Sequence, residues 1–280
     1  MNEWLSGLLR MELADLGNPE ALAAKVIELI PNAPFPLPLD EIARQLNISD
    51  IRYEATDAFE GCLICLPGKT HGGIIINNRQ RPTRRRFTLG HELGHWLIPS
   101  HTATRQRFVC SARDFSATGD GPNKALRMEW EANRFAAHLL IPTSVLARSL
   151  DRIRHFDLTH LLALADKFGT SKEFTAIRVV EVTDEPCCVI TSHEGVVRRV
   201  YKQRSFPRIA VWRNDAVPIA SLTGIVSDSP GSVSDLSEVD AAQWLETQYG
   251  SRLPSLFEQV HVQEGGHRLT FLTVDSEHDE

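Results

Sequence analysis

The residues with the clearest chemical potential lie in one segment, which reads RRRFTLGHELGHWLI from Arg84 to Ile98. His91 and His95 are four residues apart, so on a helix both imidazoles lie on one face and can converge on a single metal ion. Glu92 points about 100° away from His91 around the helix, where its carboxylate can reach a metal-bound water and act as a general base. The spacing therefore predicts a hydrolytic metal centre with His91 and His95 as ligands and Glu92 as the catalytic residue. The alternative is a core helix whose two histidines make ordinary hydrogen bonds.

The same segment has the start and stop signals of a helix. Pro82 and Thr83 can begin it, and Pro99 ends a run without any internal proline. Gly90 and Gly94 each cost about 1 kcal/mol of helix propensity relative to alanine. Their presence suggests that another backbone or a ligand must come close to this helix.

A second predicted helix, residues 124–141, supplies the other half of the site and ends at Pro142. Glu129 and Asn133 are four residues apart and share a face. Glu129 can therefore be the third metal ligand, and Asn133 an outer group that orients a ligand histidine. Glu131 is the rival third ligand, but it lies about 200° from Glu129 around the helix, so the two cannot both face the metal.

From Ile51 the pattern changes to short β-type runs separated by Gly, Pro and Asp. Three such runs, 51–54, 61–66 and 73–77, predict a small three-stranded sheet before the first metal-binding helix. We expect the last run, which ends at Asn77, to be an edge strand that can take a substrate backbone as an added strand. The polar segment 101–123 is expected to be a loop that serves either as a lid or as a spacer.

Helices are also expected outside this core, over residues 1–16, 20–30, 40–46, 158–168 and 172–180. The last two form a hairpin with helix-turn-helix proportions. Its second helix offers only Lys172 and Arg178 as phosphate contacts, so the sequence argues against direct DNA binding. After Pro186 the chain becomes β-rich, with candidate strands at 187–191, 196–201, 209–212, 257–262 and 269–274.

The composition is that of a soluble globular protein, with 42% hydrophobic and 24% charged residues among 280. A net charge of −6 gives no overall field that would attract nucleic acid or an anionic membrane. Neither a membrane span nor a secretion signal is recognisable. The five cysteines have no framework spacing, so they are expected to be reduced, and Cys62 and Cys65 to lie in a buried strand. We therefore expect a cytoplasmic protein.

Two motifs together resemble the ImmA/IrrE family of metallo-endopeptidases: RFTLGHELGH from Arg86 to His95, and ExxANxFAAxLLIP from Glu129 to Pro142. The resemblance extends over about residues 20–182. It implies a zincin-like fold, a zinc cofactor with manganese as the alternative, His91, His95 and Glu129 as metal ligands, and Glu92 as the catalytic glutamate. Several family members cleave a helix-turn-helix repressor, and many carry a fused helix-turn-helix domain. Residues 1–18 are too short for such a domain, so a separate repressor is the expected substrate.

These observations predict an α+β protein in four parts. The parts are an N-terminal helix at 1–18, a zinc metallopeptidase domain at 19–150, a helix-turn-helix-like hairpin at 151–184, and a β-rich C-terminal domain at 185–280. The expected function is zinc-dependent hydrolysis of a peptide bond in a helix-turn-helix repressor, which would derepress stress-response or mobile-element genes. The alternative is a DNA-binding or toxin-antitoxin-type regulator that uses the peptidase fold as a binding scaffold.

Overall fold

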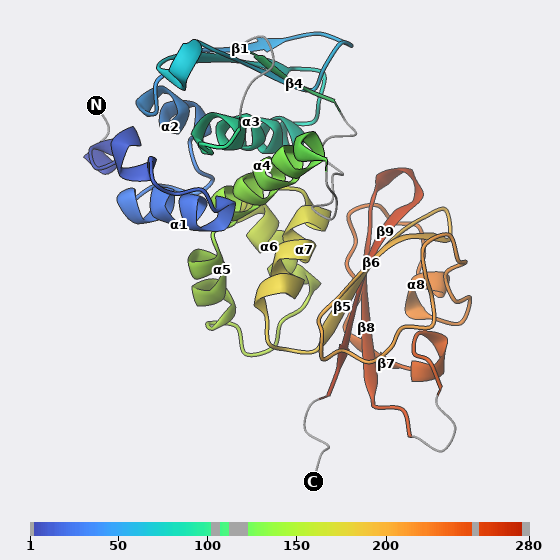
Figure 1. Cartoon of the computed structure of the whole chain (residues 1–280). Helices are drawn as coiled ribbons and strands as arrows, with labels where there is room; N and C mark the ends of the chain where they lie inside the picture. Colours follow the sequence, from blue (N-terminus) through green and yellow to red (C-terminus); the bar gives the residue numbers. More distant parts are fainter. Residues whose placement is uncertain (1–2, 102–106, 112–122, 248–251, 276–280) are drawn as a thin grey trace. The chain divides into compact units, whose positions relative to one another are not determined.

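A computed structural model describes residues 3–101, 107–111, 123–247 and 252–275 (Figure 1). The chain divides into two compact units. The first comprises residues 1–145 and 166–171, and the second comprises residues 146–165 and 172–280. The division passes through helices α5 (Thr143–Leu150) and α6 (Leu158–Phe168). None of the helices in the described ranges has the length and apolarity needed to cross a membrane.

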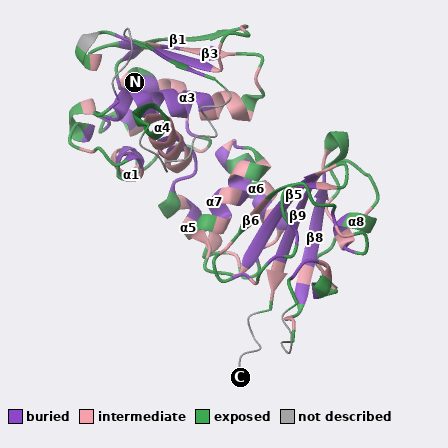
Figure 2. Ribbon diagram, turned by 45° about the vertical axis from the view of Figure 1, so that its right-hand side comes forward, coloured by how far each residue is buried: buried purple, intermediate pink, exposed green. Residues whose placement is uncertain are grey.

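The first unit is built from four strands and four complete helices in its described part. In chain order these are α1 (Pro19–Leu29), α2 (Leu39–Gln45), β1 (Ile48–Glu54), β2 (Gly61–Cys65), β3 (Gly72–Asn77), α3 (Pro82–Leu97), β4 (Arg107–Cys110) and α4 (Lys124–Leu140). Figure 1 shows α3 lying between the sheet and α4. Because α3 is covered on both sides, every residue from Thr88 to Leu97 is buried, which Figure 2 shows in purple.

The sheet of this unit has the strand order β1-β3-β2-β4, with β1 and β3 parallel and the other pairs antiparallel. The sequence predicted three strands, and the fourth, β4, lies inside the segment predicted to be a loop. Its four residues are too few to give a recognisable alternating pattern in a polar stretch. The prediction that β3 is an edge strand is wrong, because β3 pairs with β1 on one side and β2 on the other.

Local sequence accounts for where these helices begin. The side chain of Asn18 accepts hydrogen bonds from the amides of Glu20 and Ala21, which caps α1. The Asn123 side chain caps α4 in the same way by accepting from the amide of Ala125. Helix α3 has Pro82 at its first position, where a missing amide hydrogen costs nothing.

The residues before Asn18 do not form the predicted N-terminal helix. The described ones form two short 3-10 helices, Glu3–Leu5 and Arg10–Leu13. Leu5, Leu8 and Leu13 are nevertheless buried, so the apolar residues that suggested a helix do pack into the core. A 3-10 turn buries them without the regular repeat that a longer helix would need.

The second unit combines helices with an antiparallel sheet. It contains α7 (Lys172–Val182), β5 (Cys187–His193), β6 (Val196–Lys202), α8 (Leu222–Ile225), β7 (Ser237–Val239), β8 (Leu256–Val262) and β9 (His267–Val274), together with most of α6. The strand order is β6-β5-β9-β8-β7. The β-rich C-terminal region is confirmed, although residues 209–212 make only an isolated bridge and not a strand. The α+β class of the whole chain is likewise confirmed.

A buried carboxylate organises part of this second sheet. Glu258 is fully buried, and its oxygens accept hydrogen bonds from the amides of Leu222 and Thr223 and from the indole of Trp244. These donors compensate for the loss of water around the charge. Glu258 is therefore a structural residue that joins α8 and the Trp244 segment to β8.

Candidate metal centre

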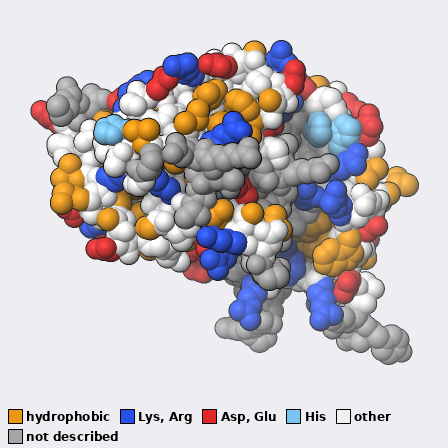
Figure 3. Space-filling view, turned by 45° about the horizontal axis from the view of Figure 1, so that its top comes forward, with side chains coloured by type: hydrophobic (Ala, Val, Ile, Leu, Met, Phe, Trp, Pro, Cys, Tyr) orange, Lys and Arg blue, Asp and Glu red, His pale blue; other side chains and the backbone are white. Residues whose placement is uncertain are grey.

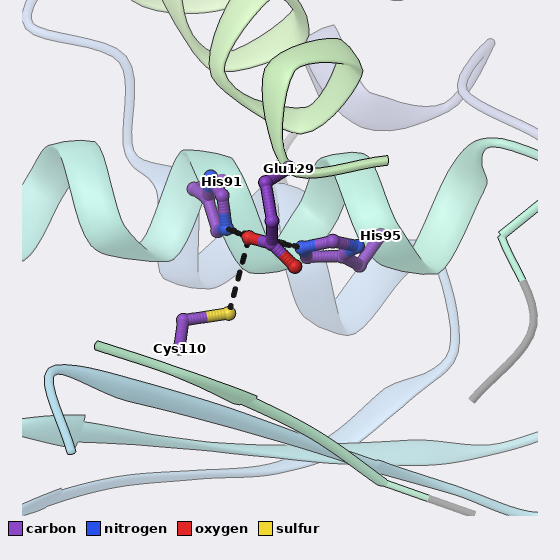
Figure 4. Close-up of side chains that lie close together, drawn as sticks. All are labelled: His91, His95, Cys110 and Glu129. Carbon is purple, nitrogen blue, oxygen red and sulfur yellow. Dashed lines mark hydrogen bonds and ion pairs between the residues drawn. The ribbon is translucent and has the colours of Figure 1, made fainter. Parts of the chain in front are cut away.

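Helices α3 and α4 bring the three predicted ligand side chains to one point (Figure 4). The Nε2 atoms of His91 and His95 lie 3.0 Å apart, as expected for residues one helical turn apart. The Oε2 atom of Glu129 lies 3.1 Å from Nε2 of His91 and 3.3 Å from Nε2 of His95. Both histidines are fully buried, so the cluster lies at the packed face between the two helices.

The glycines of α3 allow α4 to approach this closely. A methyl group at Gly94 would lie 3.0 Å from Cα of Ala132 and 3.2 Å from a ring carbon of Phe135. A methyl group at Gly90 would lie 3.3 Å from Cβ of Ala136. The expectation that another backbone comes close at these two glycines is confirmed.

Hydrogen bonds behind His91 fix which of its nitrogens carries the proton. Nδ1 of His91 lies 2.9 Å from Oδ1 of Asn133, and an amide oxygen can only accept. His91 must therefore donate through Nδ1–H, which leaves a lone pair on Nε2. Asn133 lies where the sequence predicted a group that orients a ligand histidine.

A hydrogen-bonded chain from His95 through His101 to Glu131 fixes the proton position of His95 in the same way. Nε2 of His101 lies 2.9 Å from Oε2 of Glu131, and Nδ1 of His101 lies 3.0 Å from Nδ1 of His95. With the carboxylate of Glu131 as acceptor, His101 donates to it through Nε2–H and accepts from Nδ1–H of His95. His95 is thereby left with a lone pair on Nε2, directed at Glu129.

Burial and close contacts shift the pKa values of three groups in and around the cluster. Burial is the main cause that lowers the pKa of His95 to about 4 and that of His101 to about 4, so both rings are neutral near pH 7. Burial by itself would raise the pKa of Glu129, but its contacts with His91 and His95 outweigh this and lower the pKa to about 2. The neutral imidazole of His95 thus faces the carboxylate anion of Glu129.

Three lone pairs within 3.3 Å of one another repel unless a cation lies between them, so these residues fit a metal ion. Zinc–nitrogen bonds of about 2.0–2.1 Å at tetrahedral angles place two donors about 3.3 Å apart, close to the spacings seen here. A fourth donor, Sγ of Cys110 on β4, lies 3.9 Å from Oε2 of Glu129. All four donor atoms lie within 4.8 Å of one another. The described cluster can therefore hold a metal ion through nitrogen, oxygen and sulfur.

Glu92 is not part of this donor cluster. It is fully buried and its carboxylate lies against β2, where a side chain at Gly61 would collide with Oε1 of Glu92 and with Thr88. Gly61 is thus required because the carboxylate occupies the place of its side chain. The position agrees with the sequence prediction that Glu92 points away from the ligand face of α3.

The sequence did not assign several residues that the structure places around the cluster. His101 is not one of the four donors, but it contacts His95 and Glu131. Glu131, the rival third ligand, belongs to this outer chain. No regular spacing in the sequence links Cys110 to the other three donors, because strand pairing and not a helical repeat brings it close to them. Most of the predicted lid, 102–106 and 112–122, lies outside the described residues.

Comparison with known proteins gives an independent assignment. Residues 48–180 match the model of the Peptidase M78 family, described as the IrrE N-terminal-like domain. No curated protein matches the chain significantly. A solved structure of a Mycobacterium tuberculosis transcriptional regulator has a similar fold, with a TM-score of 0.57 and 14% identity over 95% of this chain and 80% of that one. At this identity the likeness concerns the fold alone. The matched segment contains both helices of the metal cluster, and residues 48–180 of the chain therefore form an IrrE N-terminal-like domain of the Peptidase M78 family.

Proposed function

We propose that the protein is a zinc-dependent endopeptidase that hydrolyses a peptide bond in a protein substrate. The observation that carries this proposal is the convergence of the imidazoles of His91 and His95 and the carboxylate of Glu129, with Glu92 adjacent in sequence to His91. Manganese is the alternative metal, because imidazole and carboxylate donors accept either ion.

His91, His95 and Glu129 would hold the ion. When bound, the ion would act as a Lewis acid toward the substrate carbonyl and would make a water molecule more acidic. Glu92 takes a proton from the attacking water and transfers it to the nitrogen of the leaving amine, a role worth roughly 10²- to 10⁴-fold in rate. Asn133 and the His101–Glu131 pair keep the two imidazoles in the required tautomer and orientation.

The proposed substrate is a helix-turn-helix transcriptional repressor, and the proposed location is the cytoplasm. The family assignment supports the peptidase chemistry. The fold neighbour is a transcriptional regulator, which is consistent with a role in transcription. All five cysteines lie in the described part of the chain, where each is a buried thiol.

Direct DNA binding by the α6–α7 hairpin gains no support from the described side chains. Arg178 is only 2% exposed, and its guanidinium pairs with Glu181. Lys172 contacts His261 at 2.6 Å. On the face shown in Figure 3, basic side chains are interspersed with acidic and apolar ones. Since DNA binding depends on several accessible cations, a protein substrate is the better-supported partner.

The test is to incubate the purified, metal-loaded protein with the helix-turn-helix proteins encoded near it in its genome and to look for fragments. Glu92→Gln should keep the metal and lose cleavage by at least about 10²-fold, because only the proton carrier is removed. His91→Ala should lose both the metal and cleavage. Full cleavage by Glu92→Gln would remove Glu92 from its proposed role.

One observation favours the alternative function of a binding scaffold. Zinc sites with four protein donors are usually structural, whereas catalytic sites keep one position open, and Cys110 supplies a fourth donor here. A stable, uncut partner that co-purifies at full metal occupancy, with no Glu92-dependent fragments, would support the scaffold and not the peptidase.

A further inference from the structure

The thiol of Cys110 is part of the candidate metal centre although neither metal-binding helix carries it. Cys110 is fully buried, and its Sγ atom lies 3.9 Å from Oε2 of Glu129. Figure 4 shows this thiol directed from the sheet toward the side of Glu129 that faces the two histidines. Its donor atom lies within 4.8 Å of the donor atoms of His91, His95 and Glu129.

The alternation of β4 explains this orientation. Arg107 and Val109 are exposed, whereas Phe108 and Cys110 are buried, so the latter two share the face toward α3. Phe108 stacks on the imidazole of His95, with ring centres 4.5 Å apart. One inward side chain of this strand therefore covers a ligand histidine, and the next inward side chain reaches the ligand cluster.

Pairing with β2 fixes Cys110 at this depth. Cys110 pairs with Gly61 across the antiparallel strands, and side chains of directly opposite residues lie on the same face. The side-chain position of Gly61 faces the carboxylate of Glu92. The thiol is thus held on the same face of the sheet as the position that the Glu92 carboxylate approaches.

We propose that Cys110 is the fourth metal ligand and that the described conformation is a closed, latent state of the site. This inference rests on the proposed metal centre. When the sulfur–metal bond forms, the thiol proton passes to solvent and a water molecule leaves the metal; no electron is transferred. Two nitrogens, one oxygen and one thiolate form a donor set that suits tetrahedral zinc.

The latent state follows from the position of β4 in the sheet. With Cys110 bound, the fourth position that hydrolysis requires is filled. Strand β4 has four residues, and among the described strands it pairs only with β2, at the edge of the sheet. Peptide hydrolysis therefore requires that β4 release its cysteine from the metal.

The experiment is to replace zinc by Co²⁺ in the full chain and to record the near-ultraviolet absorption. A thiolate bound to Co²⁺ gives a ligand-to-metal charge-transfer band, whereas imidazole and carboxylate do not. The wild-type protein should show the band at stoichiometric Co²⁺. Cys110→Ser should bind Co²⁺ without the band, and its zinc affinity should fall by more than the roughly 10- to 100-fold typical of outer-shell changes.

Cys62→Ser is the matched control. Cys62 is also a buried thiol, on the neighbouring strand β2, but it is not one of the clustered donors. This variant should keep both the band and the zinc affinity of the wild type.

Stoichiometric Co²⁺ without the band in the wild type, or a band that persists in Cys110→Ser, would overturn the inference while leaving the metal centre intact. If the wild type binds neither Co²⁺ nor Zn²⁺, the metal centre and the inference fail together. Absence of the band in the wild type overturns the inference even if Cys110→Ser does not fold.

Discussion

At the scale of single residues, the site depends on which nitrogen of each histidine carries the proton. Asn133 sets this for His91, and the pair of His101 and Glu131 sets it for His95. Each outer partner accepts a hydrogen bond from an Nδ1–H group on the side away from the cluster, so both Nε2 lone pairs are directed at the same point. Outer partners of this kind raise metal affinity without touching the metal.

The two carboxylates of α4 should therefore differ sharply when each is changed to its amide. Glu129→Gln removes a direct donor and should abolish stoichiometric zinc binding. Glu131→Gln should leave zinc bound with an affinity reduced by about 10- to 100-fold, because it alters only the partner of His101. Zinc content after dialysis and competition with a chromophoric chelator measure both effects. Metal lost only from Glu131→Gln would show that the third ligand has been assigned to the wrong residue.

At the scale of elements, the metal centre is a consequence of how closely α3 and α4 pack. Gly94 faces the backbone of Ala132, and Gly90 faces the side chain of Ala136. The sheet holds the other side of α3, and Gly61 on β2 leaves room for the Glu92 carboxylate. Glycine at these contacts lowers the helix or strand propensity but lets the neighbouring elements pack closely.

Replacing the two glycines by alanine should have different effects. At Gly94 the new methyl group meets backbone atoms 3.0 and 3.2 Å away, which cannot move independently of α4. Gly94→Ala should therefore separate the helices, destabilise the fold by about 1–3 kcal/mol and weaken zinc binding. At Gly90 the nearest atom is a methyl carbon 3.3 Å away, and the gain of about 1 kcal/mol in helix propensity offsets the contact.

Urea unfolding and zinc titration of both variants provide the comparison. Unchanged zinc affinity in Gly94→Ala would mean that the helix separation does not set the geometry of the ligands. Gly90→Ala serves as the matched control, since it adds the same methyl group one turn earlier on the same helix.

At the scale of the whole molecule, all four candidate donors belong to the first compact unit. The second unit has its own apolar core, which includes Trp244 and residues of β5, β6, β8 and β9. Metal binding and the stability of the metal site should therefore depend on the first unit.

The metal-free first unit should be sensitive to acid. The pKa values of His95 and His101 are lowered by burial from 6.5 to about 4, so between these values the unfolded chain binds protons that the folded chain does not. Stability should consequently fall as the pH drops from about 6.5 to about 4, with a steepest slope of about 2.7 kcal/mol per pH unit for two groups. Glu129, Glu131 and Lys69 are the charged neighbours of these rings.

Urea unfolding of chelator-treated protein at several pH values measures this slope, with the first unit's transition identified by its shift on adding zinc. His101→Gln should reduce the steepest slope by about half, because one of the two groups is removed. A stability that does not change between pH 4 and pH 6.5 would contradict the neutral state assigned to the two histidines.

The sequence by itself determined the parts of this protein that depend on local periodicity. The four-residue spacings placed His91 and His95 on one face of α3, and Glu129 and Asn133 on one face of α4. The prolines marked the ends of both helices. Helix periodicity and the start and stop signals of helices are sufficient to predict these spacings and ends, because each lies within one element.

Only the tertiary structure decided which separate elements meet. Cys110, His101 and Glu131 join the site through strand pairing and helix packing, which bring residues far apart in sequence within hydrogen-bond distance. The four-residue strand β4 and the interior place of β3 were also not predictable, because sheet order depends on contacts between strands and not on the pattern within each one. Local periodicity thus predicted the donors on the helices, whereas the fourth donor depends on the fold of the whole unit.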